Sequence, residues 1–144
     1  MTRPGEIAIT HIEDIDALRP LAAAATDEGH RMVNRLIEEW HEGTNRFNDP
    51  GEVLLDAKDV SNIVAVCGLN RDPYASDPRV GRVRRLYVAP THRRRGIASL
   101  LLRAILRQAK SHFDVLHVRT SNPEADHFYR HLGFSTIEAD VFCT

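Results

Sequence analysis

Three consecutive arginines, Arg93 to Arg95, stand directly before Gly96, Ile97 and Ala98, where a long apolar helix pattern begins. At the start of a helix several backbone N–H groups lack a partner and point outward, and the helix dipole adds positive potential. Gly96 lets the backbone approach an anion with no Cβ in the way, and the small Ala98 keeps the first turn open. The segment therefore predicts a pyrophosphate site. A solvated basic turn in front of an ordinary helix is the alternative.

The preceding strand, Val80–Ala89, has a defect in its alternation. By strict alternation Val83 lies on one face of this strand, whereas Leu86 and Val88 lie on the other. All three can face one core only if a residue is inserted between them, so the pattern predicts a β-bulge near Arg84–Arg85. A bulge leaves backbone groups unpaired, and such groups are available to a ligand.

The elements that would position this turn and this strand are predicted from hydrophobic periodicity, helix caps and turn residues. Helices are expected at Ile12–Ala25, His30–His41, Gly96–Lys110 and, with Asn122 as a cap, from Pro123 to just before Gly133. The helix Gly96–Lys110 is expected to bury Ile97, Leu100, Leu101, Ala104 and Ile105. Strands are expected at Glu6–Thr10, Glu52–Ala57, Ile63–Leu69, Val80–Ala89, Val115–Arg119 and Phe134–Ala139, with Asp140–Thr144 barely long enough for another. Irregular chain is expected at Asn45–Gly51 and Asn70–Pro78, and the order predicts one α+β domain over residues 1–144.

The composition limits the classes of function. The chain has 144 residues and a formal net charge of −1, which argues against a general attraction to nucleic acid or to an anionic membrane. No apolar stretch approaches the ~20 residues that a bilayer span needs, and the first residues lack a signal pattern, so a cytoplasmic protein is expected. Cys67 and Cys143 are expected to be free thiols. His127 and His131 are one helical turn apart, but no acidic or cysteine ligand accompanies them, so no metal site is expected.

Two segments together resemble the GNAT superfamily of N-acetyltransferases. The family signature is Arg or Gln, two residues, Gly, one residue, and Gly or Ala; it is matched by Arg93, Gly96 and Ala98 after the strand Val83–Pro90. A second family segment, at the usual distance downstream, is matched by Asn122, Ala125, Phe128, Tyr129, Leu132, Gly133 and Phe134. The resemblance covers about the last 65 residues by motif and the first half only by the order of its elements.

The resemblance implies a fold and a reaction. The expected fold is a mixed, mostly antiparallel sheet with helices on both faces and a bulged, splayed strand at the acyl-CoA site. The expected reaction transfers an acetyl group from acetyl-CoA, within a ternary complex, to a primary amine of a small molecule or peptide. A module that binds acyl-CoA without catalysis, as a sensor, is the alternative. A nucleic-acid surface is the least favoured reading, and a homodimer is left open.

The resemblance also assigns roles to residues. Leu86, Tyr87 and Val88 would pair through their backbone with the pantetheine arm. The pyrophosphate would be held at Arg93, Arg94, Arg95, Gly96, Ile97 and Ala98. Asn122 and Phe128 would contact the cofactor, although Asn122 could be only a helix cap. Tyr129 would be the general acid at the thioester sulfur, and a core aromatic is its alternative role.

Two departures from the family pattern matter. Many relatives have Gly where this chain has Arg94, which is expected to have little effect because that side chain can point to solvent. Many relatives also place a glutamate on the bulged strand as general base, where this chain has Arg82 and Arg84. The base is therefore open, and the candidates are water or one of the side chains Glu28, Asp72, Asp77 and His92. The acceptor is expected between Glu28–Arg35 and Asn45–Phe47, with a solvated loop as the alternative for the latter.

Overall fold

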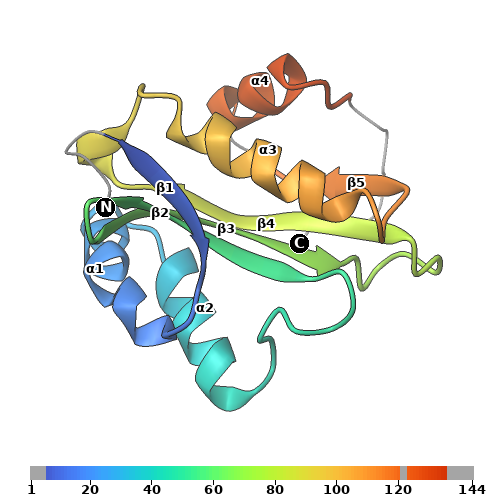
Figure 1. Cartoon of the computed structure of the whole chain (residues 1–144), viewed down its shortest axis with the longest axis horizontal. Helices are drawn as coiled ribbons and strands as arrows, with labels where there is room; N and C mark the ends of the chain where they lie inside the picture. The colour runs from blue at the N-terminus through green and yellow to red at the C-terminus, as the bar shows by residue number, and fades with distance from the viewer. Residues whose placement is uncertain (1–5, 121–122, 136–144) are drawn as a thin grey trace.

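A computed structural model of the chain describes residues 6–120 and 123–135. Its centre is a five-stranded sheet whose strands lie side by side in chain order. The strands are β1 (Ile7–His11), β2 (Val53–Asp59), β3 (Asn62–Arg71), β4 (Val80–Val88) and β5 (Val115–Val118). The first four pair antiparallel with their neighbours, and β5 pairs parallel with β4. The helices α1 and α2 lie below this sheet and α3 and α4 above it (Figure 1). The expected fold class is confirmed.

Capping side chains and proline positions explain where the first helices begin. They are η1 (Ile15–Leu18), α1 (Arg19–Asp27), α2 (Met32–Glu42), η2 (Pro90–His92), α3 (Ile97–Ala109) and α4 (Pro123–His131). The single helix expected from Ile12 is wrong, because Asp14 accepts the Asp16 N–H and caps a separate 3-10 turn. The α-helix starts only at Arg19, with Pro20 in its first turn, where a missing N–H costs nothing.

Each face of the sheet has its own apolar core. The core between the sheet and helices α1 and α2 contains Leu54, Val66 and Tyr87 from the strands. The core between the sheet and helices α3 and α4 contains Leu55, Cys67, Val83 and other residues of the same strands. Strand alternation sends neighbouring residues to opposite cores, so a single sheet supports both layers of helices.

One face of α3 differs from the expected set. Leu102 is fully buried, whereas Leu100 is 44% exposed. Both leucines flank the row of Ile97, Leu101 and Ile105, so periodicity alone favours neither. The packing of α3 against the sheet turns the Leu102 side inward, and this part of the prediction is wrong.

Strand β3 continues through Asn70 and Arg71, which pair with Arg82 and Gly81, so the irregular connection begins at Asp72 rather than Asn70. Cys67 is a buried free cysteine. The expected cap Asn122, most of the strand Phe134–Ala139, the tail and Cys143 lie outside the described residues. Among the described residues, no helix is both long and apolar enough to cross a membrane.

Candidate active site

The bulge predicted in β4 is present. Gly68 of β3 faces Arg84 and Val66 faces Tyr87, so Arg85 and Leu86 together stand opposite Cys67. Arg85 takes up the inserted residue with a left-handed φ of 63°. The change of parity lets Val83 before the bulge and Leu86 after it pack against the same α3/α4 core.

The second half of β4 also separates from β5. Strand β5 pairs only with residues Val80–Val83, and within the described residues no strand lies beside β4 beyond that point. Val88 pairs across from Ala65, and the neighbouring Ala89 N–H donates to the Val64 carbonyl at 2.8 Å, so the N–H and C=O of Val88 point away from β3. The Val88 carbonyl oxygen accepts from Arg93 Nε at 3.1 Å. The backbone from Leu86 to Val88 therefore forms an open edge next to the bulge.

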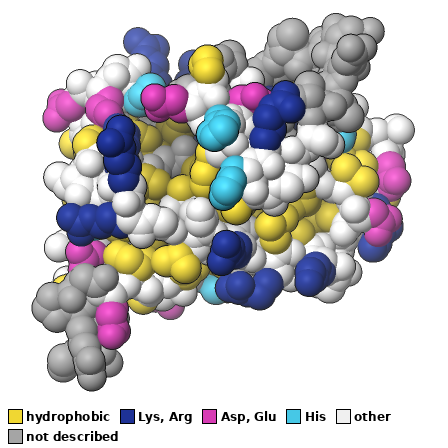
Figure 2. All heavy atoms as spheres, turned by 90° about the horizontal axis from the view of Figure 1, so that it is seen from above, with side chains coloured by type: hydrophobic (Ala, Val, Ile, Leu, Met, Phe, Trp, Pro, Cys, Tyr) yellow, Lys and Arg dark blue, Asp and Glu magenta, His cyan; other side chains and the backbone are white. Residues whose placement is uncertain are grey.

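The turn into α3 follows directly after this edge. Arg94 and Gly96 have left-handed φ values of 63° and 77°, and Gly96 is the N-cap of α3. Arg94, Arg95 and Gly96 are exposed, and a Cβ placed on Gly96 would meet nothing within 4 Å. Figure 2 looks onto the α3/α4 face and shows Lys and Arg side chains at the left of the view, where this turn lies in Figure 1. The unpaired N–H groups at the start of α3 and the surrounding positive charge suit a phosphate group.

Arg93 points elsewhere. Its guanidinium donates to both carboxylate oxygens of Glu28, with Nη1–Oε2 at 2.8 Å, and lies 5.6 Å from the centroid of the Tyr87 ring. The Tyr87 hydroxyl donates to the same carboxylate. The hydrogen bonds from Arg93 and Tyr87 lower the pKa of Glu28 to about 2, and burial together with the Glu28 hydrogen bond raises the pKa of Tyr87 to about 12. In this structure the Arg93 side chain therefore links Glu28 to the Val88 carbonyl oxygen, and its role at the pyrophosphate stays a prediction.

Tyr129 lies on α4 and packs into the α3/α4 core with 8% of its surface exposed. Its ring lies 5.3 Å from the Phe128 ring and 5.6 Å from the Phe134 ring, centroid to centroid. Burial, with a contribution from nearby Cys67, raises the pKa of Tyr129 above its ordinary value, so the phenol keeps its proton. Cys67 is the residue opposite the bulge, and its side chain lies in the same α3/α4 core as the Tyr129 ring. Among residues 6–120 and 123–135, no hydrogen-bond partner of the Tyr129 hydroxyl is found.

The sequence and the fold can be compared with known proteins. Residues 15–134 match the acetyltransferase (GNAT) family. The chain belongs to the GNAT family. It is therefore an acyltransferase of a family that binds acetyl-CoA.

Solved structures agree with this assignment. A protein of Exiguobacterium sp. 255-15 that was assigned as an acetyltransferase is 30% identical, with a TM-score of 0.82 and coverage of 94% of this chain and 89% of that chain. A GNAT-family acetyltransferase of Staphylococcus aureus Mu50 is 18% identical, with a TM-score of 0.75 and coverage of 96% and 90%. The enzyme AAC(6')-Iy, solved with a CoA bisubstrate analogue, is 16% identical, with a TM-score of 0.72 and coverage of 97% and 98%. No curated protein matches the sequence.

The four side chains considered as general base in this GNAT chain all have other partners. Glu28 binds Arg93 and Tyr87. Asp72 is fully buried and accepts from the Tyr74 N–H at 2.9 Å, from His117 Nδ1 at 2.9 Å and from Arg119 at 3.3 Å. Asp77 accepts the Arg79 N–H, and His92 Nε2 lies 2.9 Å from an oxygen of Asp59. The base stays open.

One carboxylate at the bulge was missed. Oε1 of Glu39 on α2 lies 3.1 Å from Nη2 of Arg85, so α2 brings a carboxylate to the side chain of the bulge residue. Glu39 follows Leu36 by three residues and so borders the buried stripe of α2, which is the only local signal for it.

The proposed acceptor side is more ordered than a solvated loop. Phe47 is buried, and its ring covers Gly68 so closely that a Cβ there would overlap it. The side-chain amides of Asn45 and Asn70 exchange two hydrogen bonds, at 2.9 and 3.0 Å. Both contacts fix this segment against the α1/α2 face of β3. In the described part of the chain, no group of three or more His, Cys, Asp or Glu side chains could hold a metal ion.

Proposed function

We propose that the protein is an N-acetyltransferase that transfers an acetyl group from acetyl-CoA directly to a primary amine. The observation that carries this proposal is the continuous path formed by the bulge, the open edge Leu86–Val88 and the turn Arg94–Ala98. A pantetheine arm lying along that edge would bring its pyrophosphate to the start of α3 and its thioester to the bulge. Asn122 and Phe128 remain proposed cofactor contacts.

The proposed reaction combines proton transfers with the exchange of the C–S bond of the thioester for a C–N bond. The amine must first lose a proton, since an amine with a lysine-like pKa of ~10.4 is almost fully protonated at neutral pH. The neutral nitrogen then attacks the thioester carbonyl carbon to form the C–N bond. The resulting tetrahedral intermediate breaks its C–S bond, and the nitrogen releases its second proton to solvent, which leaves the amide. Tyr129 donates its phenolic proton to the departing sulfur, and solvent returns a proton to Tyr129. The Tyr129 phenol holds its proton at neutral pH, as a general acid must, although its raised pKa makes it a weaker acid than an ordinary tyrosine.

The test is release of free thiol from acetyl-CoA in the presence of a panel of amines, with the acetylated product identified by mass. Thiol release that depends on an amine supports the proposal. Tight binding of acetyl-CoA without amine-dependent release would instead favour the non-catalytic sensor, a reading that rests on Arg82 and Arg84 replacing a strand acid.

A further inference from the structure

We propose that the acceptor amine carries an anionic group, a carboxylate or a phosphate, that binds to the guanidinium groups of Arg82, Arg84 and Arg119. This inference rests on the proposed N-acetyltransferase function and adds the class of acceptor. It follows from where these arginines lie, from their unmatched charge and from their distance to the cofactor turn.

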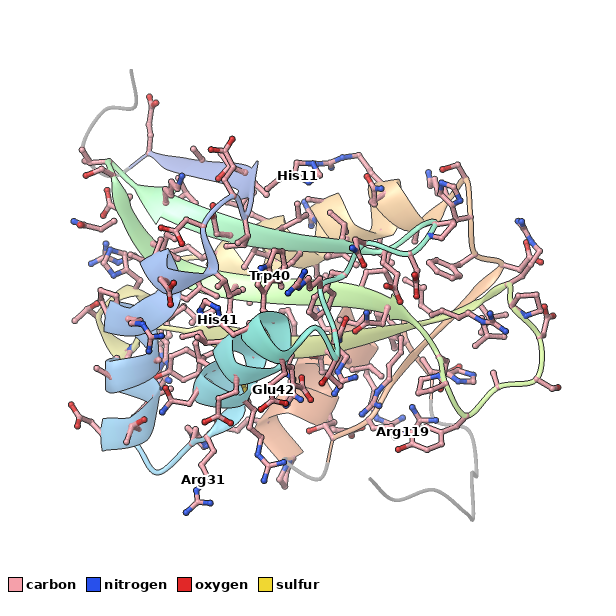
Figure 3. The ribbon with its side chains drawn as sticks, turned by 90° about the horizontal axis from the view of Figure 1, so that it is seen from below. His11, Arg31, Trp40, His41, Glu42 and Arg119 are labelled. Atoms are coloured by element: carbon pink, nitrogen blue, oxygen red, sulfur yellow. The ribbon has the colours of Figure 1, made fainter. Side chains whose placement is uncertain are left out.

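The three arginines share one face of the sheet. Arg82 pairs with His117 of β5, and Val83 pairs with Val118. Because Val83 and Val118 face the α3/α4 core, Arg82, Arg84 and Arg119 face the opposite side, where α1 and α2 lie. In Figure 3, which views this side, Arg119 lies beyond α2 near the end of β5, so neither helix covers it.

The positive charge in this cluster is not balanced within the part of the chain that the structure describes. Together with Arg85 the cluster holds four guanidinium groups, and the described carboxylates in contact with them are Glu39 and Asp72. Burial and then the charge of Arg119 lower the pKa of Arg82; burial and then the charges of Arg85 and Arg82 lower that of Arg84. The folded chain thus keeps like charges close together in a poorly solvated place, which an anion would relieve.

Several N–H donors of these guanidinium groups also lack a hydrogen-bond acceptor among the described residues. The Nε atoms of Arg82, Arg84 and Arg85 and Nη1 of Arg119 are buried and have no hydrogen-bond partner among the residues that the structure describes. Buried donors without partners are rare in folded proteins and are costly to leave unmet. Carboxylates and phosphates are the ligands that guanidinium groups bind best, because they accept two parallel N–H bonds.

Neighbouring side chains hold the arginines of this cluster in place. Buried Asp72 accepts from both His117 and Arg119, and the Tyr74 ring lies 4.9 Å from the Arg119 guanidinium and 5.8 Å from that of Arg82. Burial alone would raise the pKa of Asp72, but the hydrogen bonds from Tyr74 and His117 and the charge of Arg119 hold it below its ordinary value. Arg119 is therefore fixed by an ionised partner, and its other donors remain for a ligand.

The cofactor turn cannot be the partner of this cluster. Val88 is six positions beyond Arg82 along β4, which is about 20 Å at 3.3 Å per residue, and the turn lies beyond Val88. Arg84, in contrast, is two residues from Leu86 at the bulge, or about 7 Å along the strand. Strand β4 thus has an anion site near each end and the bulge between them. An acceptor bound by its anion at Arg84 would present an amine a few bonds away to the thioester.

The experiment compares pairs of amines that differ in one anionic group. O-phosphoethanolamine is compared with ethanolamine, and β-alanine with β-alaninamide, by kcat/KM from thiol release. We expect the anionic member of at least one pair to be preferred by about 10-fold or more, and the pair that shows this identifies phosphate or carboxylate as the group recognised. Polyamines should be poor acceptors because the cluster repels them.

Variants then assign the preference to the cluster. Arg84→Met keeps the length of the side chain and removes its charge, so KM for the anionic acceptor should rise about 10-fold or more while KM for its neutral analogue is unchanged. Its Tm should be equal to or above that of the wild type, since a desolvated and repelled charge is lost. Arg103→Met removes an exposed charge from α3 and should change neither value. Arg82→Met serves the same purpose if Arg84→Met does not fold.

The outcomes separate this inference from the function on which it rests. Equal or better turnover of the neutral amines would overturn the inference and leave the N-acetyltransferase function standing. If no amine releases thiol, the proposed function fails, and calorimetric titration of O-phosphoethanolamine and β-alanine decides the inference alone. Binding to the wild type that is lost in Arg84→Met would support an anion site, and no binding to the wild type would reject it.

Discussion

The carboxylate of Glu28, next to the end of α1, holds the guanidinium of Arg93 with both of its oxygens, although 65 residues separate them in the chain. Arg93 in turn donates to the carbonyl oxygen of Val88 at the open edge of β4. The layer of helices below the sheet is thereby tied to the turn that leads into α3.

This contact makes stability depend on pH in the acid range. The Glu28 carboxylate stays ionised in the folded chain down to a pKa of about 2, against an ordinary value of 4.5. Its pairing therefore stabilises the fold fully above pH 4.5, and this contribution is lost as pH falls through the folded pKa. We expect Glu28→Gln to lower Tm at pH 7 and the difference from wild type to shrink between pH 4.5 and 2. Glu38→Gln, an exposed change on α2, should show no such trend in thermal unfolding; an equal trend there would refute the assignment.

A substitution at Gly96 tests whether the turn before α3 binds the pyrophosphate. Gly96→Glu places a negative charge where the pyrophosphate is proposed to bind, and like charges in contact cost several kcal/mol. We expect acetyl-CoA affinity, measured by calorimetry, to fall by about 100-fold or more. Gly43→Glu is the matched control, because Gly43 has a φ of 80° beside a helix end and carries the same backbone cost. Affinity that falls equally in both variants would mean that the loss comes from the fold rather than from the site.

Tyr129→Phe removes the hydroxyl and keeps the buried ring. If the phenol protonates the departing sulfur, kcat should fall by about 100-fold with acetyl-CoA affinity unchanged. The Tm should hardly move, because the hydroxyl has no hydrogen-bond partner among the described residues. Full turnover in a less stable protein would show that the hydroxyl serves the core and that the proton comes from another group. Steady-state kinetics and thermal unfolding on the same samples distinguish these results.

Gly68 tests the packing under Phe47. A Cβ at Gly68 would overlap the Phe47 ring, so Gly68→Ala should destabilise the fold by about 1–3 kcal/mol in urea unfolding. Phe47→Ala alone should cost about 3–5 kcal/mol through the cavity it leaves. In the double variant the new methyl group enters that space, so the combined cost should be less than the sum. Additive costs would mean that the two residues do not meet.

The sequence predicted those parts of the site that are encoded locally. The bulge was visible because an inserted residue changes the parity of Val83 and Leu86, and the turn was visible because Gly96 separates a basic run from a helix. Contacts between distant segments left no such trace. Nothing near Arg93 indicates that its partner is Glu28, and nothing near Arg85 indicates Glu39. Which of Leu100 and Leu102 is buried depends on how α3 is rotated about its own axis where it packs on the sheet, and periodicity does not encode that rotation.

The open edge of β4 has a consequence for how the protein behaves in a concentrated solution. A strand whose N–H and C=O groups face solvent is a template for pairing with another chain. Among the described residues, no strand covers the backbone of Leu86 and Val88, and the Arg93 side chain bonds to one of its carbonyl groups. A bound pantetheine arm would cover it. We therefore expect acetyl-CoA to act as a solubilising agent for this chain, which light scattering of samples with and without it would reveal.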